Sequence, residues 1–343
     1  MSKTVVGLDI GSESIRAIEV SGVGSSRPTV LRYHEVVLPD GAVKSGEVAE
    51  TNTVADALRQ LWSAGKFRSK KVILGVGSSK VLVRDLTLPK LEPRELQLSI
   101  ASHVQDMLPV PVADALLDFY PTSESGTPTG PVVTGLLVAA VKESVLANVK
   151  AVQRAGLVPV AVDLIPFALT RLHKGTGNLA FVDVGSRTTN VIVTSNGVPQ
   201  FVRIIATGGH DLTSALSTRL QISMPEAELL KRTVGLDFTV THPDQAMTVQ
   251  IIREVTTDLL NSLRNTLAFY ANTRQNEPYS GVVLTGGGST LRGFAAALGE
   301  ITRIQVSVID PFSQVTLASQ AQQPTVDRQA MNVALGLAMG SAA

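Results

Sequence analysis

The stretch Leu8–Ser12, Leu-Asp-Ile-Gly-Ser, recurs as Val-Asp-Val-Gly-Ser at Val182–Ser186, about halfway along the 343-residue chain. An apolar run precedes each copy, and a second run rich in β-branched residues and then a turn follow it. This order predicts a β-hairpin in each half of the chain, with an aspartate near the end of its first strand. A motif that repeats at half the chain length predicts two lobes of similar fold.

The turn of each predicted hairpin has the composition of a phosphate-binding loop. Glycine lets the backbone approach an anion closely, and successive N–H groups of a tight turn can converge on one phosphate. One such turn by itself is more often an ordinary hairpin turn, but the repeat favours a function for both. The predicted phosphate ligands are Gly11, Ser12, Glu13 and Ser14 in the first turn, and Gly185, Ser186 and Thr188 in the second.

The aspartates of the two copies are Asp9 and Asp183. Two lobes of similar fold would turn both carboxylates toward a shared cleft. Mg²⁺ prefers oxygen ligands and keeps several of its waters, so two carboxylates beside a polyphosphate suit it. The sequence therefore predicts a Mg²⁺ site between Asp9 and Asp183.

A third glycine-rich element follows an apolar segment at Val282–Ser289. It predicts a strand, a glycine turn and the start of a helix, whose first N–H groups attract anions. A glycine triplet alone is weak evidence of a site, and the sequence contains neither a P-loop nor a dinucleotide-binding glycine motif. After two phosphate hairpins, the element is expected to close the cleft over the nucleoside through Gly286, Gly287, Gly288 and Ser289.

The composition argues against several other classes of protein. Lys and Arg number 30 and Asp and Glu 29, so the chain lacks the basic excess of a nucleic-acid-binding protein. The chain contains no cysteine, which excludes disulfides and thiolate metal sites. The sequence shows neither a signal peptide nor an apolar run of membrane-spanning length. These features predict a cytoplasmic protein that reaches a membrane only through partners.

Two Asp-x-Gly-Ser hairpins followed by Thr-Gly-Gly-Gly resemble the actin, Hsp70 and sugar-kinase superfamily. The resemblance implies an α/β, actin-like (ribonuclease H-like) fold that binds ATP or ADP with Mg²⁺ between its lobes. Gly208 and Gly209 resemble the Gly-Gly segment that follows the second phosphate loop, and Glu228 and Lys231 resemble helix residues that flank the nucleoside. Without the resemblance, Glu228 and Lys231 would be interpreted as an ordinary i,i+3 ion pair.

Longer segments resemble one branch of this superfamily, the PilM proteins of type IV pilus assembly, which are related to the cell-division protein FtsA. These segments are Pro39–Val48, Val83–Pro89, Ala139–Lys142 and Val152–Asp163. FtsA-like proteins usually carry a basic amphipathic tail, and this sequence shows none, which favours PilM. The resemblance implies a two-lobed ATPase fold with an FtsA/PilM-type inserted α/β subdomain.

The resemblance also implies a division of the chain. The expected parts are residues 1–88 plus 159–177 (first lobe), 89–158 (inserted subdomain), 178–210 plus 279–343 (second lobe) and 211–278 (a mostly helical subdomain). Within the insert, Leu116–Tyr120 is expected as a strand and Ser123–Pro131 as a flexible loop. In the helical subdomain, apolar residues that recur every four positions from Ile251 to Leu263 predict a helix face that packs in the core.

In function, the resemblance implies a cytosolic ATP-binding scaffold, peripheral to the inner membrane, in a pilus machine. PilM proteins bind the N-terminal cytoplasmic tail of the inner-membrane protein PilN in a groove between the first lobe and the insert. Other platform components and the assembly ATPase are further expected partners, and nucleic acid is not. Two alternatives stay open: an FtsA-like, filament-forming protein of cell division, and a small-molecule kinase of the same superfamily.

The segment that returns the chain to the first lobe bears on hydrolysis. Many bacterial actin relatives carry an acid there that orients the attacking water. Here Ile165 stands where that acid often lies. Asp163 is the alternative candidate, although a carboxylate at a strand end is more often structural. Without a group to orient water, positioned phosphates give little turnover, so we expect slow or absent ATP hydrolysis and assign no catalytic residue.

Overall fold

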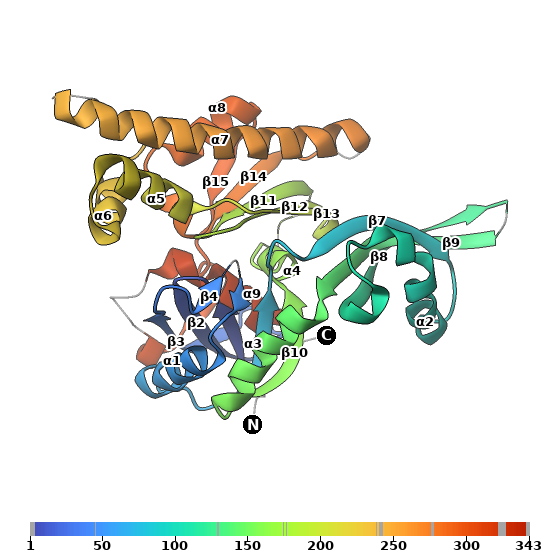
Figure 1. Ribbon diagram of the computed structural model, residues 1–343. Helices are drawn as coiled ribbons and strands as arrows, with labels where there is room; N and C mark the ends of the chain where they lie inside the picture. Colours follow the sequence, from blue (N-terminus) through green and yellow to red (C-terminus); the bar gives the residue numbers. More distant parts are fainter. Residues whose placement is uncertain are drawn as a thin grey trace.

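The computed structural model describes residues 4–44, 46–128, 130–173, 175, 177–237, 239, 243–275, 278–321 and 327–340. Figure 1 shows two lobes, one above the other, with an inserted subdomain extending to one side. The sheet of each lobe contains one of the two predicted hairpins. The expectation of one repeated hairpin per lobe is therefore confirmed.

The sheet of the first lobe has the strand order β10-β6-β1-β2-β3-β16. Strands β1 and β2 form the first hairpin, β3 continues the antiparallel meander, and β6 runs parallel to β1. A short hairpin of β4 and β5 precedes the first helix. The strands are β1 (Val5–Ile10), β2 (Ser14–Ser21), β3 (Thr29–Val37), β4 (Val43–Lys44), β5 (Glu47–Val48), β6 (Lys71–Val76), β10 (Val158–Leu164) and β16 (Thr316–Leu317).

Helices cover both faces of this sheet, which is why every residue of β1 is buried. Side chains of α1 (Thr51–Ala64) and α3 (Lys142–Arg154) pack with Leu8 on one face, and α4 (Ile165–Thr170) and α9 (Asn332–Met339) pack with Val5 on the other. A Cβ on Gly7 would lie 1.9 Å from the carbonyl oxygen of Ala334. The absence of a side chain at this position lets α9 lie directly on β1.

The second lobe repeats the first arrangement with the strand order β13-β12-β11-β14-β15. Strands β11, β12 and β13 form the antiparallel meander, and β14 runs parallel to β11. Helices α7 and α8 pack on one face of this sheet, and Figure 1 shows the long α7 lying across the top of the lobe. The strands and these helices are β11 (Asn178–Val184), β12 (Thr189–Ser195), β13 (Val198–Ile205), β14 (Gly281–Thr285), β15 (Val306–Val308), α7 (Pro243–Thr273) and α8 (Phe294–Thr302).

A helical subdomain joins α5 (Gly209–Leu220), α6 (Met224–Val234) and the first part of α7 around a separate apolar core. Ser223 and Glu226 form a capping box that starts α6. The apolar face of α7 is buried, because Ile251 belongs to this core and Leu259 and Leu263 belong to the core of the second lobe. The prediction that this face packs in the core is confirmed.

The two lobes share an apolar core where they meet. Leu169 of α4 packs in one cluster with Phe181 of β11 and Ile192 of β12, although α4 also covers the first sheet. The same helix therefore contacts both sheets. Since apolar burial is the main favourable term in folding, this contact holds the bases of the lobes together while their hairpin turns face one another.

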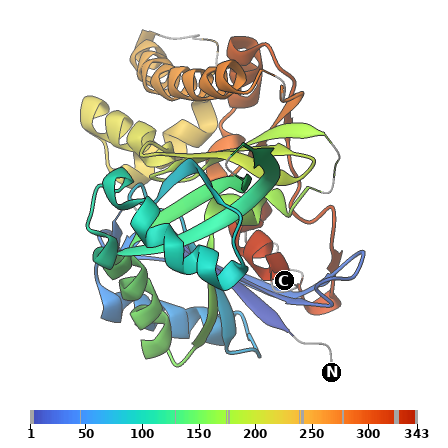
Figure 2. The same cartoon turned by 90° about the vertical axis from the view of Figure 1, so that its right-hand side faces the viewer.

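The inserted subdomain is a sheet of order β7-β9-β8 with one helix packed against it. In the view of Figure 2 the subdomain lies in front of the junction between the lobes. An ion pair of 3.0 Å between Asp85 of β7 and Arg274, just beyond α7, ties it to the second lobe. Its elements are β7 (Leu82–Pro89), α2 (Pro93–His103), β8 (Ala115–Thr127) and β9 (Gly130–Val141).

Several expected boundaries shift when pairing is taken into account. Strand β7 pairs with β9, so the insert begins near Leu82 rather than at residue 89. Helix α3 packs on α1 and therefore belongs to the first lobe rather than the insert. Strand β16 pairs with β3, and α9 packs on β1, so the C-terminal part of the segment 279–343 also belongs to the first lobe.

The segment Ser123–Pro131, expected as a flexible loop, instead continues the hairpin of β8 and β9. Its polar sequence hides the strand, because the residues of β8 from Ser123 to Thr127 are exposed on both faces of the hairpin and need no apolar side chains. Position 129 lies outside the described residues. Among the helices of the described ranges, none is both long enough and apolar enough to cross a membrane.

Candidate functional site

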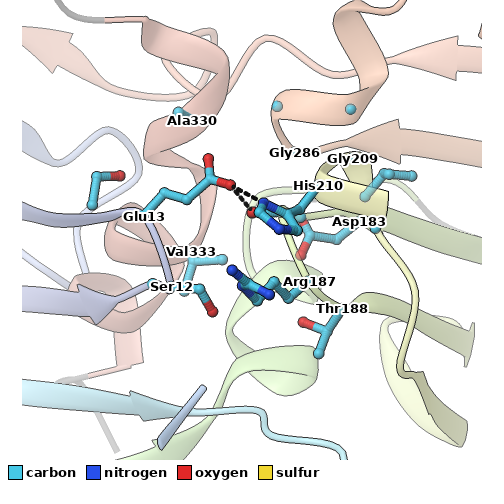
Figure 3. A pocket seen from close by; sticks show the side chains of 18 of the residues that line it. Ser12, Glu13, Asp183, Arg187, Thr188, Gly209, His210, Gly286, Ala330 and Val333 are labelled. Atoms are coloured by element: carbon cyan, nitrogen blue, oxygen red, sulfur yellow. Dashed lines mark hydrogen bonds and ion pairs between the residues drawn. The ribbon is translucent and has the colours of Figure 1, made fainter. Parts of the chain in front are cut away.

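A cleft of about 410 Å³ lies between the lobes, within the roughly 300–1,000 Å³ typical of ligand pockets. Most of the predicted site residues line it, although they come from distant parts of the chain. They are Asp9, Gly11, Ser12, Glu13, Ser14, Asp183, Gly185, Ser186, Thr188, Gly208, Gly209, Glu228, Lys231, Gly286, Gly287 and Gly288. Figure 3 shows several of them facing one another across the cleft.

The turns between β1 and β2 and between β11 and β12 have the same internal geometry. The N–H of Gly11 donates to the carbonyl of Ser14 at 3.0 Å, and the N–H of Gly185 donates to the carbonyl of Thr188 at 2.9 Å. The glycine N–H groups thus close the turns and are not available to a ligand. Any phosphate donors from the backbone have to be the N–H groups that follow each glycine.

Asp9 and Asp183 are both buried at the end of the cleft. Arg16 lies 3.6 Å from Asp9, and the side-chain amide of Asn190 donates to Asp183 at 3.0 Å. Burial raises the pKa of Asp9 above its ordinary value. Burial is also the main cause that raises the pKa of Asp183 from 3.8 to about 6, and the charge of Asp9 raises it further. The two carboxylates therefore repel one another across the cleft, a cost that a divalent cation would remove.

In the ranges that the structure describes, no group of three or more His, Cys, Asp or Glu side chains converges on one point. A cation at Asp9 and Asp183 would therefore take its other ligands from water or phosphate. Mg²⁺ is commonly bound in this way, by one or two carboxylates together with substrate oxygens. The donor set of the cleft fits Mg²⁺ held jointly with a polyphosphate.

The glycine turn after β14 packs directly on the end of β11, beside the turn between β11 and β12. Gly286 has a φ of +84°, and a Cβ there would lie 2.5 Å from the carbonyl oxygen of Val184 and 2.7 Å from Asp183 Oδ1. Ser289, predicted to contact the nucleoside, differs from the glycines. Its side chain is buried in the 3₁₀ helix η3 (Gly287–Thr290) and donates to the carbonyl of Gly286 at 2.6 Å. Ser289 thus fixes the turn and does not line the cleft.

Gly208 and Gly209 line the cleft as a support for the second loop. The N–H of Gly209 donates to the carbonyl of Gly185 at 2.9 Å, and that of Gly208 donates to the carboxylate of Asp211 at 2.7 Å. A Cβ on Gly208 would lie 2.4 Å from the carbonyl oxygen of Ser186. Close packing explains Gly208, whereas a Cβ on Gly209 would come no nearer than 3.5 Å to Lys231 Nζ. The N–H groups of both glycines already have acceptors within the protein.

Glu228 and Lys231 form the ion pair that their spacing predicts, at 2.6 Å, and both line the cleft. Burial raises the pKa of Glu228, but hydrogen bonds from Lys231, Thr213 and Arg232 outweigh it and lower the pKa to about 2. The Lys231 ammonium also donates to the carbonyl of Gly209 at 3.2 Å. This network joins α5 to α6 at the mouth of the cleft.

Several lining residues were missed by the sequence reasoning. Arg16 lies two residues after Ser14 on β2, so strand alternation gives a signal that it shares the cleft-facing side. Gln329 and Asn332, from η5 (Arg328–Met331) and α9, carry no sequence motif and reach the cleft only through tertiary packing. The other polar residues in this class are Glu35, Arg187, Asn190, Thr207, His210, Arg232, Thr256, Thr290 and Asp327.

Some polar atoms around the cleft are buried without a hydrogen-bond partner in the described part of the chain. Buried polar atoms are almost always paired in folded proteins, so their convergence on one cleft indicates a polar ligand. The atoms are Ser14 Oγ, Arg187 Nε, Asn190 Oδ1, Thr256 Oγ1, Gln329 Oε1 and Asn332 Oδ1. Their mixture of donors and acceptors fits a nucleotide better than an apolar molecule.

The two candidates for orienting water lie in different surroundings. Ile165 lines the cleft, beside Gly75 and Gly77 of the β6 end. The carboxylate of Asp163 lies outside the cleft and pairs with Arg171 at 2.5 Å. The interpretation of Asp163 as a structural carboxylate at a strand end agrees with this contact.

The comparisons with known proteins agree with the fold. The chain resembles a solved PilM–PilN type IV pilus biogenesis complex, with 27% identity, a TM-score of 0.85 and coverage of 99% of this chain and 98% of the other. It also resembles MreB5 of Spiroplasma citri bound to ADP, with 12% identity, a TM-score of 0.56 and coverage of 97% and 94%. This likeness shows the actin-like fold alone.

Among characterised sequences, the cell-division protein FtsA of Bacillus subtilis is 24% identical over 89% of this chain and 78% of its own length. The FtsA of Escherichia coli K12 is 28% identical over 51% of this chain, and the match spans about half of that protein. The family described as type IV pilus assembly protein PilM matches residues 7–342, nearly the whole sequence. The chain has an actin-like fold and belongs to the PilM family of type IV pilus assembly proteins.

Proposed function

We propose that this chain is a scaffold of type IV pilus assembly that binds ATP or ADP with Mg²⁺ between its lobes. The observation that carries the nucleotide part is the meeting of Asp9 and Asp183 in one cleft between two matching phosphate turns. The unpartnered Ser14 hydroxyl supports it, since this buried donor lies beside the first turn. The actin-like fold adds a family of nucleotide-bound relatives, of which the ADP-bound MreB5 is an example.

The test begins with identification of any nucleotide released when the purified protein is denatured. Stripped protein is then titrated with ATP and ADP, with and without Mg²⁺. Asp9→Asn is expected to remove the Mg²⁺-dependent part of the affinity, because only one carboxylate then faces the cation. Asp163→Asn is the matched control, since that carboxylate lies outside the cleft. Equal Mg²⁺ dependence in both variants would contradict the proposal.

The scaffold docks to the inner-membrane platform by binding the N-terminal cytoplasmic tail of PilN. The resemblance to the PilM–PilN complex over almost the full length of both chains supports this partner. In the described part of the chain, β10 is the outer strand of its sheet and exposes Val158, Val160 and Val162. An outer strand with apolar side chains can accept an extended peptide as an added strand. We place the tail at β10.

A synthetic tail peptide tests this docking in a titration with nucleotide-loaded protein. Binding at micromolar affinity or better supports the proposal, and no binding by a folded, loaded sample contradicts it. Attachment to the inner membrane then depends on the tail, so the chain is expected to be cytoplasmic when PilN is absent. Other platform components and the assembly ATPase are the further partners to probe in the same assay.

Hydrolysis is proposed to be slow or absent, because the lining residue nearest the return to the first lobe is Ile165 and not an acid. An isoleucine cannot accept a proton from water or hold it in line with a phosphate. Single-turnover measurements on stripped, ATP-loaded protein test this point. Turnover comparable to that of a fast actin-like ATPase, and lost in Asp9→Asn, would contradict it.

An FtsA-like polymer is the second candidate, and the match to FtsA of Bacillus subtilis over 89% of the chain is the observation that favours it. Polymerisation would add a function to the same fold without changing the cleft. Sedimentation of the protein with ATP, with ADP and without nucleotide separates a polymer from a non-polymerising scaffold. A pelleted fraction that depends on nucleotide is expected only of the polymer.

A further inference from the structure

The side chain of Glu13 spans the cleft between the two lobes. It extends from the first phosphate loop, and its Oε1 accepts a hydrogen bond of 2.6 Å from Ser186 Oγ. The same oxygen lies 3.0 Å from Nδ1 of His210, the second residue of α5. Figure 3 shows the contact between Glu13 and His210 as a dashed line. One carboxylate thus links the first lobe to two elements of the second.

Ser186 is one of the groups expected to bind phosphate, so Glu13 and a phosphate need the same donor. A serine hydroxyl has a single proton, and while Glu13 accepts it no phosphate oxygen can. Hydrogen bonds to a carboxylate are short and strong, comparable to those to a phosphate. The two anions would also repel one another if both occupied the space between the loops.

The loops around Glu13 offer more donors than this carboxylate uses. Ser14 Oγ and Arg187 Nε are buried at the same cleft without a partner among the described residues. The whole Ser14 residue is only 4% exposed. A carboxylate supplies two oxygens, whereas a phosphate chain supplies many, which suits the group of donors better.

We infer that Glu13 is an internal competitor for phosphate, whose carboxylate holds Ser186 and His210 until the phosphate chain of a nucleotide displaces it. The inference rests on the proposed binding of nucleotide in this cleft. Displacement exchanges one link between the lobes for another, since the phosphate chain lies between the same two loops. Glu13 therefore sets how tightly phosphate-bearing ligands bind, and has no effect on ligands without phosphate.

The experiment compares wild type with Glu13→Gln, which keeps the shape of the side chain and removes its charge. Stripped protein is titrated with ATP, ADP and adenosine in the presence of Mg²⁺. A neutral amide competes less well than a carboxylate, so ATP and ADP are expected to bind about tenfold more tightly to the variant. The affinity for adenosine is expected to stay within about twofold of wild type, because adenosine carries no phosphate.

Asp327→Asn is the matched control for charge. Asp327 lines the same cleft, and its carboxylate accepts a hydrogen bond from the backbone N–H of Gln329. The side-chain oxygen of an asparagine can accept the same bond. The hydrogen bond to Glu228 is the main cause that raises the pKa of Arg232. The negative charges of Asp327 and Glu13 both raise that pKa further. If Asp327→Asn raised the affinity for ATP as much as Glu13→Gln did, the gain would come from removal of negative charge in general. The inference would then be wrong.

A double-mutant cycle locates the competition at Ser186. In a Ser186→Ala background the shared donor is absent, so Glu13→Gln is expected to improve ATP affinity by less than about threefold. A full tenfold gain in that background would overturn the inference.

The remaining outcomes separate the inference from the proposed function. If Glu13→Gln raised the affinities for ATP and adenosine equally, Glu13 would be a simple barrier to entry. If the variant bound ATP more weakly, Glu13 would be a ligand of Mg²⁺ or of the nucleotide. Either result overturns the inference. An unchanged ATP affinity in a protein that does bind ATP refutes the inference alone. A protein that binds neither ATP nor ADP in wild-type or Glu13→Gln form refutes the proposed function as well.

Discussion

Asp9 and Asp183, each near the end of a strand in a different lobe, lie close enough for the charge of Asp9 to raise the pKa of Asp183. Among the described residues, neither carboxylate has a full set of charged partners. Asp9 has Arg16 at 3.6 Å, and Asp183 has the neutral amide of Asn190. The fold thus keeps two buried, mutually repelling carboxylates at the base of a cleft, an arrangement that costs stability without a ligand and attracts a cation.

Asp183→Asn is expected to stabilise the ligand-free protein at neutral pH. Burial, with the charge of Asp9 as a further cause, raises the pKa of Asp183 to about 6 in the folded chain. A raised pKa gives stability that is complete below about pH 4 and is lost as the pH rises through about 6. The loss amounts to about 3 kcal/mol at most, and asparagine avoids it.

Urea unfolding of wild type and Asp183→Asn, without divalent cations, measures this effect at pH 4.5 and 7.5, about 1.5 pH units either side of the folded-state pKa. The free energy of unfolding of the variant should exceed that of wild type by clearly more at the higher pH than at the lower. The same variant should lose the Mg²⁺-dependent part of ATP binding. A variant that is less stable than wild type at neutral pH would contradict the assignment of Asp183 as a strained carboxylate.

Gly286→Ala is expected to lower the free energy of unfolding by about 1–3 kcal/mol. Its φ of +84° strains any residue with a Cβ, and that Cβ would lie 2.5 Å from the carbonyl oxygen of Val184. Gly287→Ala is the neighbouring control, because a Cβ there meets nothing within 4 Å. That control should stay within about 0.5 kcal/mol of wild type. Similar losses in both variants, measured by urea unfolding, would argue against the tight packing of this turn on the end of β11.

Asp163→Asn is expected to leave the rate of ATP turnover unchanged and to cost about 1 kcal/mol of stability. The carboxylate holds Arg171, whose guanidinium also donates to the carbonyl of Gly336 in α9 at 3.3 Å. Loss of the pair loosens the contact between α4 and α9 and does not touch the cleft. Single-turnover assays and thermal unfolding separate the two effects. A fall in turnover with unchanged stability would assign Asp163 to hydrolysis instead.

Val160→Asp is expected to weaken binding of the PilN tail peptide about tenfold or more, because it places a charge on the outer strand proposed to receive the peptide. Val160 is 49% exposed, so the substitution should not disturb folding. Val37→Asp provides the control, since Val37 is 76% exposed at the end of β3 in the same lobe. Titration calorimetry with the peptide should show the loss only in Val160→Asp. Equal affinities would place the tail elsewhere.

The sequence by itself determined the two hairpins and identified the turn glycines, hydroxyls and paired aspartates that the structure brings to the cleft. These signals are local: an alternating strand, an aspartate, a glycine turn and a second strand lie within about fifteen residues, and the steric demands of a tight turn restrict which residues fit. Repetition of the pattern in Asp9–Ser12 and Asp183–Ser186 then indicated a shared site. The family resemblance supplied the order of the larger parts.

Tertiary structure alone decided which lobe each later segment joins. Helix α9 packs on β1 through Gly7, and this places Asn332 in the cleft. Strand β7 joins the insert because its partner is β9, which no pattern within β7 reveals. The contact of Glu13 with Ser186 and His210 likewise depends on the closure of one lobe on the other. Local sequence sets backbone geometry over a few residues, whereas these contacts join segments far apart in the chain and form only through the packing of the whole core.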